Sequence, residues 1–378
     1  MSALVAADIS APQVAYALVA PILVVFGAGL VSVLVEAFAP RRVRWNAQVG
    51  VTVVGLLASF VTVVLAADDP KGSTAAKAVV VDGPTLFLQG TILVLALLGV
   101  LTMAERFAGS EGNAFTSQGA SVPGSAYEAA TARAGWVQSE VFTLTLFSVA
   151  GMLLFPAAGD LLTMFVALEV LSLPLYLMCG LARRRRLLSQ EAALKYFLLG
   201  SFSSAFFLFG VALLFGFSGS LYLDDIATAI AGTTSSNTML LIGVAMVSVG
   251  LLFKVGAVPF HSWTPDVYQG APTPVTGFMA ACTKVAAFGA MLRLFYVAVQ
   301  GNRWDWQPLV WAVAIATMVV GSVLAITQTD VKRMLAYARS RTPASSSPAC
   351  WPSTRPACRA RSSTWPPTAS PRSARSPS

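Results

Sequence analysis

Nine long apolar runs, separated by short polar stretches, divide most of the chain. They cover residues 14–36, 47–66, 85–105, 138–156, 159–181, 191–217, 238–258, 272–299 and 308–327. A helix of about 20 apolar residues crosses the hydrocarbon core of a bilayer, which is about 30 Å thick. Each run therefore predicts one membrane-spanning helix. A tenth run starts at Asp330 and soon ends, so we expect an all-α polytopic membrane protein with nine complete spans and a partial tenth.

Basic residues follow the odd-numbered runs and predict the orientation of the chain. They are Arg41, Arg42 and Arg44 after the first run, residues 183–186 after the fifth, and Lys332 and Arg333 after the ninth. Loops rich in lysine and arginine face the cytoplasm, so we expect the N-terminus outside. The four consecutive arginines could also bind lipid or nucleic acid, but the topology signal already accounts for them.

The composition excludes several classes of protein. Of 378 residues, 56% are hydrophobic and 11% are charged, whereas about a quarter of an average soluble domain is charged. A soluble globular enzyme is thereby excluded. The chain has one histidine, His261, no CxxC pair among its four cysteines, and neither a P-loop nor a Rossmann-type glycine motif. These features argue against a haem, metal, iron–sulfur or nucleotide site in this chain.

Four charged side chains lie inside the apolar runs: Glu169, Lys195, Lys254 and Lys284. A charge in mid-span costs on the order of 2.5–3.5 kcal/mol on insertion scales, so these residues need a partner, water or a function. Lys195 is close enough to the end of its run to reach the interface instead. Glu169 could form a purely structural ion pair with a lysine. Lys284 is too central to reach the interface.

Two prolines lie close to these charges. We expect Pro259 to interrupt or kink the seventh span just after Lys254, and Pro174 to kink the fifth span five residues after Glu169. Broken helices at membrane depth occur where they line a polar cavity. We also expect a tight structured turn at residues 264–277 and a flexible loop at residues 106–136, which is rich in Gly, Ser and Ala.

This combination of residues suits the movement of protons. Burial favours the neutral forms of lysine and glutamate, whereas a nearby opposite charge favours their charged forms. A lysine between a carboxylate and a second lysine can therefore take up or release a proton when its neighbour changes charge. His261 can carry a proton near neutral pH, or it can serve only as a hydrogen-bonding residue. Candidate hydroxyl intermediates are Ser201, Ser203, Ser204 and Thr283.

Four segments of the chain resemble one protein family. They are LEVLSLPLYL, EAALKYFLLGSFSSAFFLFG, FKVGAVPFHSWTPDVYQGAPTPVTGFMAACTK and QTDVKRMLAY. The PFHSWTPDVYQGAPTPV string within them is long and specific. The resemblance is to the antiporter-like subunit N family of bacterial respiratory complex I (NADH-quinone oxidoreductase), and it covers about residues 10–338.

The resemblance implies an antiporter-like helix bundle with two inverted repeats, each containing a broken helix. It implies a subunit that moves protons across the bacterial plasma membrane, driven by electron transfer from NADH to quinone in partner subunits. Those partners would hold the FMN and the iron–sulfur clusters, while this chain would bind no cofactor or metal and have no catalytic redox centre. Its own partners would be the lipid bilayer and the other membrane subunits. The family's relay residues match Glu169, Lys195, Lys254, His261 and Lys284.

We divide the chain into four parts on this basis. Residues 1–137 hold three spans and the flexible loop, residues 138–299 form the first antiporter-like repeat, and residues 300–338 hold the ninth span and the start of the tenth. Residues 339–378 contain no Leu, Ile, Val, Phe or Met, so we expect them to be disordered. They hold seven arginines and no acid, and so account for seven of the eight net positive charges. No nucleic-acid partner is implied.

The last part departs from the family, whose chains continue with further spans. Codon degeneracy allows the segment after residue 338 to encode an apolar helix in another reading frame, so we interpret the tail as frameshifted. Two alternatives to a proton-translocating subunit stay open. One is a subunit of a multi-subunit cation/proton antiporter, and the other is an inert truncated product.

Overall fold

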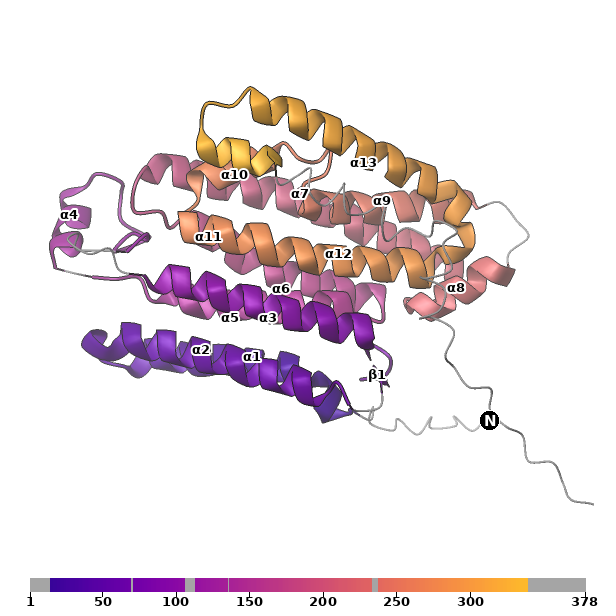
Figure 1. Cartoon of the computed structure of the whole chain (residues 1–378), viewed down its shortest axis with the longest axis horizontal. Helices are drawn as coiled ribbons and strands as arrows, with labels where there is room; N and C mark the ends of the chain where they lie inside the picture. The colour runs from indigo at the N-terminus through magenta and orange to yellow at the C-terminus, as the bar shows by residue number, and fades with distance from the viewer. Residues whose placement is uncertain (1–13, 69–70, 106–112, 135, 233–236, 339–378) are drawn as a thin grey trace, which may run out of the picture.

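The computed structural model describes residues 14–68, 71–105, 113–134, 136–232 and 237–338, which fold into a bundle of long helices (Figure 1). Nine helical segments in these residues are long and apolar enough to cross a membrane, and they coincide with the nine predicted spans. The expected all-α polytopic membrane protein is therefore confirmed. The predicted disordered tail lies outside the described residues.

Most spans are single helices. They are α1 (Tyr16–Phe38), α2 (Arg41–Leu65), α3 (Gly83–Ala104), α5 (Glu140–Leu154), α6 (Leu161–Cys179), α7 (Arg186–Ser218), α9 (Thr238–Val255) and α13 (Arg303–Ile326). The eighth span consists of α11 (Thr273–Phe278), the π-helical turn η2 (Met279–Thr283), α12 (Lys284–Arg293) and a second π-helical turn, η3 (Leu294–Ala298). A further helix covers residues 331–338.

Short elements connect the spans. They are α4 (Ala126–Arg133), the 3₁₀ turns η1 (Phe155–Ala157) and η4 (Gln300–Asn302), α8 (Leu223–Gly232), α10 (Trp263–Gly270), and the antiparallel strands β1 (Gly72–Thr74) and β2 (Val79–Val81). Two aspartates at one end of the bundle begin spans as N-caps. Asp82 accepts a hydrogen bond from the Thr85 N–H at 2.9 Å at the start of α3, and Asp160 accepts one from the Thr163 N–H at 2.7 Å at the start of α6. Each satisfies a backbone donor that the helix leaves free.

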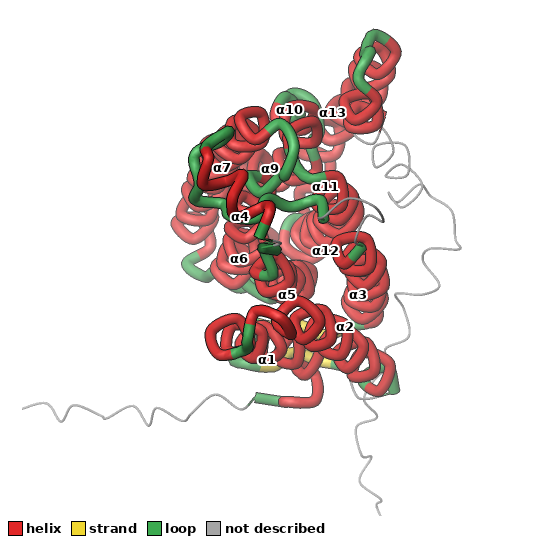
Figure 2. The backbone as a smooth tube through the Cα atoms, turned by 90° about the vertical axis from the view of Figure 1, so that its left-hand side faces the viewer, coloured by secondary structure: helices red, strands yellow, loops and turns green. Residues whose placement is uncertain are grey.

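Helix α5, in the fourth span, forms the centre of one half of the bundle. Helix α5 packs against α1, α3 and α6, as the end-on view shows (Figure 2). In the most apolar 18-residue window of the α5–η1 span, 78% of the residues are buried. In the corresponding window of the span that contains α13, 11% are buried. Helices α7, α9 and α12 form the other half, with α7 against α9 and α12 against both α9 and α3. The candidate site lies between α6, α7 and α9.

The structure corrects two expectations about the connections. Residues 113–134 are not simply a flexible loop, because they contain α4 and are anchored by the buried Arg186, which donates to the carbonyl of Gly119 at 3.0 Å and lies 3.2 Å from Glu128. Residues 264–277 are not only a turn. They form most of α10 and the first part of α11, because the prolines stand in the first turns of these helices, where no backbone donor is lost.

We call the end of the bundle that carries residues 183–186 the arginine end. Helices α1, α3 and α6 end there and α2, α5 and α7 begin there, close to α4 at the left of Figure 1. The opposite end carries the β-hairpin. This alternation is the one expected for consecutive spans joined by short connections.

Candidate functional site

Lys254 lies where the seventh span breaks. Helix α9 ends at Val255, and Gly256 follows with a φ of 75°, in the left-handed region that glycine adopts without steric penalty. Two backbone hydrogen bonds complete a Schellman cap, from Gly256 to Phe253 and from Ala257 to Leu252. The expected break is present, but it begins before Pro259, because the glycine cap and not the proline ends the helix.

The Lys254 side chain is buried among aromatic rings. Its exposed fraction is 4%, and its Nζ lies 5.3 Å from the ring centroids of both Tyr176 and Tyr196. The Trp263 ring stacks on that of Tyr196 at a centroid distance of 4.7 Å. We call Tyr176, Tyr196 and Trp263 the aromatic cage. An ammonium over a ring face is favoured by about 2 kcal/mol when it is removed from water, so the cage compensates part of the cost of burial.

Glu169 supplies the opposite charge from α6. It shares one face of that helix with Ser172 and Tyr176, because the three positions are separated by three and four residues. The Glu169 carboxylate interacts electrostatically with both Lys254 and Tyr176. Its Oε1 is buried and accepts no hydrogen bond from any residue that the structure describes. The same holds for the Lys254 Nζ as donor, so Lys254 is compensated by the ring faces and by the field of Glu169 and not by a direct hydrogen bond.

Lys284 enters the interior from the eighth span. It is 8% exposed and is the first residue of α12, directly after the π-helical turn η2. The Thr283 hydroxyl donates to the carbonyl of Met279 at 2.6 Å within that turn. Such π-helical turns inside longer helices are frequent at functional sites. Because α12 packs against α9, Lys254 and Lys284 lie on neighbouring helices.

His261 lies in the connection between α9 and α10. Its ring centroid is 6.2 Å from that of Tyr337. Its Nδ1 is buried and has no hydrogen-bond partner among the described residues. Burial lowers the pKa of the His261 imidazole below its ordinary value, so the neutral form is favoured near pH 7.

Lys195 lies apart from the other charges, at the arginine end. Its side chain is 43% exposed, and its Nζ is 2.7 Å from Glu191 and 3.1 Å from Asp266. The other oxygen of Asp266 accepts a hydrogen bond from Arg333 at 2.8 Å. We call Glu191, Lys195, Asp266 and Arg333 the Asp266 cluster. It joins α7, α10 and the helix at residues 331–338.

The other residues singled out from the sequence have different positions. Ser203, Ser204 and Thr283 are buried, whereas Ser201 is exposed and does not face the interior. Helix α6 continues through Pro174 as one helix. In the turn before this proline, the buried Ser148 hydroxyl donates to the Leu171 carbonyl at 2.9 Å, so a neighbouring helix satisfies a carbonyl close to the disruption. The described residues contain no group of three or more His, Cys, Asp or Glu that could hold a metal ion.

Comparisons with known proteins agree with this geometry. Residues 158–339 match the family described as NADH:quinone oxidoreductase/Mrp antiporter, transmembrane. The chain is 60% identical over 350 residues to NADH-quinone oxidoreductase subunit N of Rhodococcus opacus (strain B4), covering 88% of this chain and 65% of that protein. It is 57% identical over 344 residues to the subunit N of Mycobacterium bovis (strain ATCC BAA-935 / AF2122/97). The chain is a homologue of complex I subunit N.

Solved structures show the same architecture. A chain of respiratory complex I from Thermus thermophilus with bound aureothin is 30% identical to this homologue, with a TM-score of 0.67 over 86% of the present chain and 62% of that chain. A chain of the Mrp complex from Dietzia sp. DQ12-45-1b is 22% identical with a TM-score of 0.69, which shows the fold alone. The subunit N homologue spans 65% of the length of its Rhodococcus relative. Its described residues therefore form an antiporter-like membrane bundle.

Sequence reasoning missed several residues of the site in this subunit N homologue. The aromatic cage was not predicted, although Tyr176 lies seven residues after Glu169 and hence on the same helical face. Gly256 was passed over in favour of Pro259. Asp266 was not singled out, and Arg333 was used only to predict orientation. No periodicity in the sequence could pair them, because they lie 67 positions apart and become neighbours only through the fold. Glu169 lies within electrostatic reach of Lys254, whereas Lys195 pairs with Glu191 and Asp266.

Proposed function

We propose that this chain is the proton-translocating subunit N of a bacterial NADH-quinone oxidoreductase. The observation that carries the proposal is the buried Lys254 at the break of α9, within the electrostatic reach of the partly buried Glu169. A lysine that lies against an aromatic cage and near a single carboxylate, without a hydrogen-bonded partner in the described residues, can change its protonation state when the charge of that carboxylate changes. The identity to named subunits N supports the same function.

The proposed relay uses the charges in sequence. When Glu169 loses its negative charge or moves away, Lys254 loses its counter-charge and releases a proton. When the carboxylate returns, Lys254 takes up a proton again. Lys284, on the helix that packs against α9, would receive the proton, and His261, beside the break, would exchange protons with it. Lys195 would lie at the entrance, within the Asp266 cluster.

The proposal includes the setting of the subunit. The chain would lie in the bacterial plasma membrane with its N-terminus outside and the arginine end facing the cytoplasm. Other membrane subunits of the complex would be its partners. NADH, FMN, iron–sulfur clusters and quinone would be bound by partner subunits, and the subunit itself would carry no redox centre.

Complementation tests this function. The chain is expressed in a bacterium that lacks its own subunit N, and NADH oxidation and NADH-driven acidification are measured in inverted membrane vesicles. Lys254→Met and Glu169→Gln should each abolish most of the acidification. Lys71→Met, which changes an exposed lysine, serves as the matched control and should leave acidification intact. Normal acidification by both site variants would contradict the relay.

The same vesicles distinguish the alternatives. A family description that also names Mrp antiporters favours cation/proton exchange as the second candidate. Sodium-driven proton movement in the absence of NADH, with no NADH-driven acidification, would support that candidate. If the unaltered chain restores neither activity, the chain is an inert product and the proposal fails for it.

A further inference from the structure

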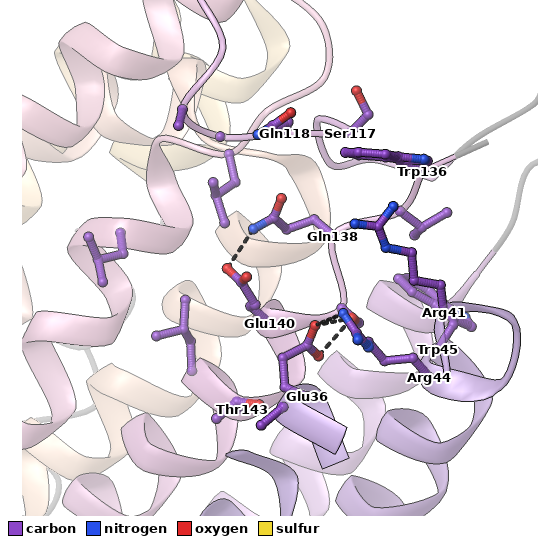
Figure 3. A pocket seen from close by; sticks show the side chains of 18 of the residues that line it. Glu36, Arg41, Arg44, Trp45, Ser117, Gln118, Trp136, Gln138, Glu140 and Thr143 are labelled. Carbon is purple, nitrogen blue, oxygen red and sulfur yellow. Dashed lines mark hydrogen bonds and ion pairs between the residues drawn. The ribbon is translucent and has the colours of Figure 1, made fainter. Parts of the chain in front are cut away.

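A large pocket opens at the arginine end, away from Glu169 and Lys254. Its volume is about 1210 Å³, and it lies where α1 ends, α2 and α5 begin and α6 ends (Figure 3). Residues 117–120 and 136–139 form its rim. None of the residues in the proposed proton relay lines it. The pocket therefore needs an explanation of its own.

The acidic side chains in this pocket are already satisfied. The Glu36 carboxylate accepts hydrogen bonds from Ser139 at 2.8 Å and from Gln48 at 2.9 Å, and forms a salt bridge with Arg44 at 3.1 Å. The network continues inward, where the Ser32 hydroxyl lies 2.6 Å from that of Thr143. Because Arg44 neutralises Glu36, this pair fixes the junction of α1, α2 and α5 but contributes no net charge to the pocket.

Two arginines in the pocket are free of carboxylate partners within the described part of the chain. Arg41 lies with its guanidinium 4.2 Å from the ring centroid of Trp136, so the ring orients its charge (Figure 3). Arg42 is exposed on the same helical turn. The one further acid, Glu140, accepts a hydrogen bond from Gln138 at 2.7 Å. The charged lining therefore holds three arginines and two glutamates, with an excess of positive charge.

Below this polar rim the lining is apolar and faces outward. Val33 on α1 is 43% exposed and Leu177 on α6 is 62% exposed, and both line the pocket with Leu144 of α5. Helix α5 packs against both α1 and α6, so these side chains give the pocket a partly exposed apolar side. Trp136 at the rim matches the position in which tryptophan meets a membrane interface.

We propose that this pocket binds the headgroup of an anionic phospholipid. The phosphate would bind to Arg41 and Arg42, and the acyl chains would lie along Val33, Leu144 and Leu177. A basic pocket between transmembrane helices, continuous with exposed apolar residues, has the chemistry that recognises such lipids. A soluble anion would use the arginines but would leave the apolar side of the pocket uncovered. The proposed lipid site shares no residue with the proposed proton relay, so it is independent of that proposal.

Native mass spectrometry of the purified full chain tests the proposal. The chain in detergent is offered equal amounts of phosphatidylglycerol and phosphatidylethanolamine with the same acyl chains. Two arginines close to the headgroup should favour the anionic lipid on the order of tenfold. The double substitution Arg41→Gln/Arg42→Gln should remove this preference. The matched control Arg183→Gln/Arg184→Gln, at exposed arginines of the same end outside the pocket, should keep it.

Two further arms keep the test decisive. Trp136→Leu removes the ring that orients Arg41 and should weaken the preference without changing the charge, while circular dichroism checks that the helices are retained. Glycerol phosphate is added as a headgroup without chains. Displacement of the lipid by glycerol phosphate at equal concentration would show a soluble-anion site and overturn the proposal. Equal retention of both lipids, or an unchanged preference in the Arg41/Arg42 variant, would overturn it too.

Discussion

The carboxylate of Asp266 lies 3.1 Å from the ammonium of Lys195. Lys195 is on α7 one residue before Tyr196 of the aromatic cage, and Asp266 is on α10 three residues after Trp263 of the same cage. The ion pair therefore ties α7, whose Tyr196 ring faces Lys254, to α10, whose Trp263 ring stacks on Tyr196. The other carboxylate oxygen of Asp266 accepts a hydrogen bond from Arg333 at 2.8 Å. This contact adds the helix at residues 331–338 to the same junction.

Asp266→Asn should affect proton movement more than stability. Because the paired side chains are partly exposed, the loss of one charge should lower the unfolding free energy by less than about 1 kcal/mol. The position of the cage should nevertheless change, so NADH-driven acidification in complemented vesicles should fall. Asp305→Asn, which changes an exposed aspartate at the start of α13, is the control. Unchanged acidification in the Asp266 variant would show that the cluster has only a structural role.

Gly256→Ala should destabilise the chain more than Gly219→Ala. Both glycines end a helix with a positive φ, 75° and 71°, so alanine is strained at either position by about 1–2 kcal/mol. At Gly256 the added Cβ would also lie 2.8 Å from the Oγ1 of the buried Thr264, whereas at Gly219 it meets nothing within 4 Å. We expect the Gly256 variant to lose about 1 kcal/mol more. Thermal unfolding of the purified chain in detergent measures the difference, and equal midpoints would contradict the steric argument.

Gly200→Ala should displace Tyr176 from Lys254. The new Cβ would lie 2.1 Å from the Tyr176 hydroxyl oxygen, and a tyrosine ring in a packed interior cannot bend away. We expect a loss of about 1–3 kcal/mol in unfolding free energy together with a loss of acidification. Gly50→Ala, in a helix position where the Cβ meets nothing within 4 Å, should be neutral or stabilising. Adding Tyr176→Phe to the Gly200 variant should recover part of the stability, and no recovery would argue against this contact.

Arg293→Met should be among the most destabilising single changes. The Arg293 guanidinium is 8% exposed, and it donates to the Pro156 carbonyl at 2.6 Å and to Asp82 at 2.9 Å. Its loss leaves an aspartate at the start of α3 without its counter-charge, which costs about 3–5 kcal/mol when such a pair is buried. Since Asp82 is partly exposed, we expect the lower end of that range.

The control and the reversal for this prediction use the same unfolding assay. Arg184→Gln changes an exposed arginine and should alter the unfolding free energy by less than about 0.5 kcal/mol. Adding Asp82→Asn to Arg293→Met removes the uncompensated charge while keeping an N-cap. The double variant should therefore be more stable than the Arg293 variant alone. A further loss of stability in the double variant would contradict the charge argument.

The positions of the spans were predictable because a bilayer imposes a length and an apolar composition on every crossing helix. The intramembrane charges were predictable because each is costly in isolation. The termination of α9 was assigned to Pro259, since proline is the strongest breaker in the sequence, but the Gly256 cap ends the helix first. The two π-helical turns of the eighth span have no signal in composition or periodicity, because they follow from packing against neighbouring helices.

The sequence by itself determined that the chain is a multi-span helical membrane protein and that Glu169, Lys254 and Lys284 are exceptional within it. These properties depend on single residues and on their cost in lipid. Only the tertiary structure decided which charges lie near one another: Lys254, against the aromatic cage, within the electrostatic reach of Glu169, and both Lys195 and Arg333 with Asp266 at the arginine end. The physical reason is that charge compensation acts over a few ångströms in space, and helices far apart in the chain are brought that close only by packing.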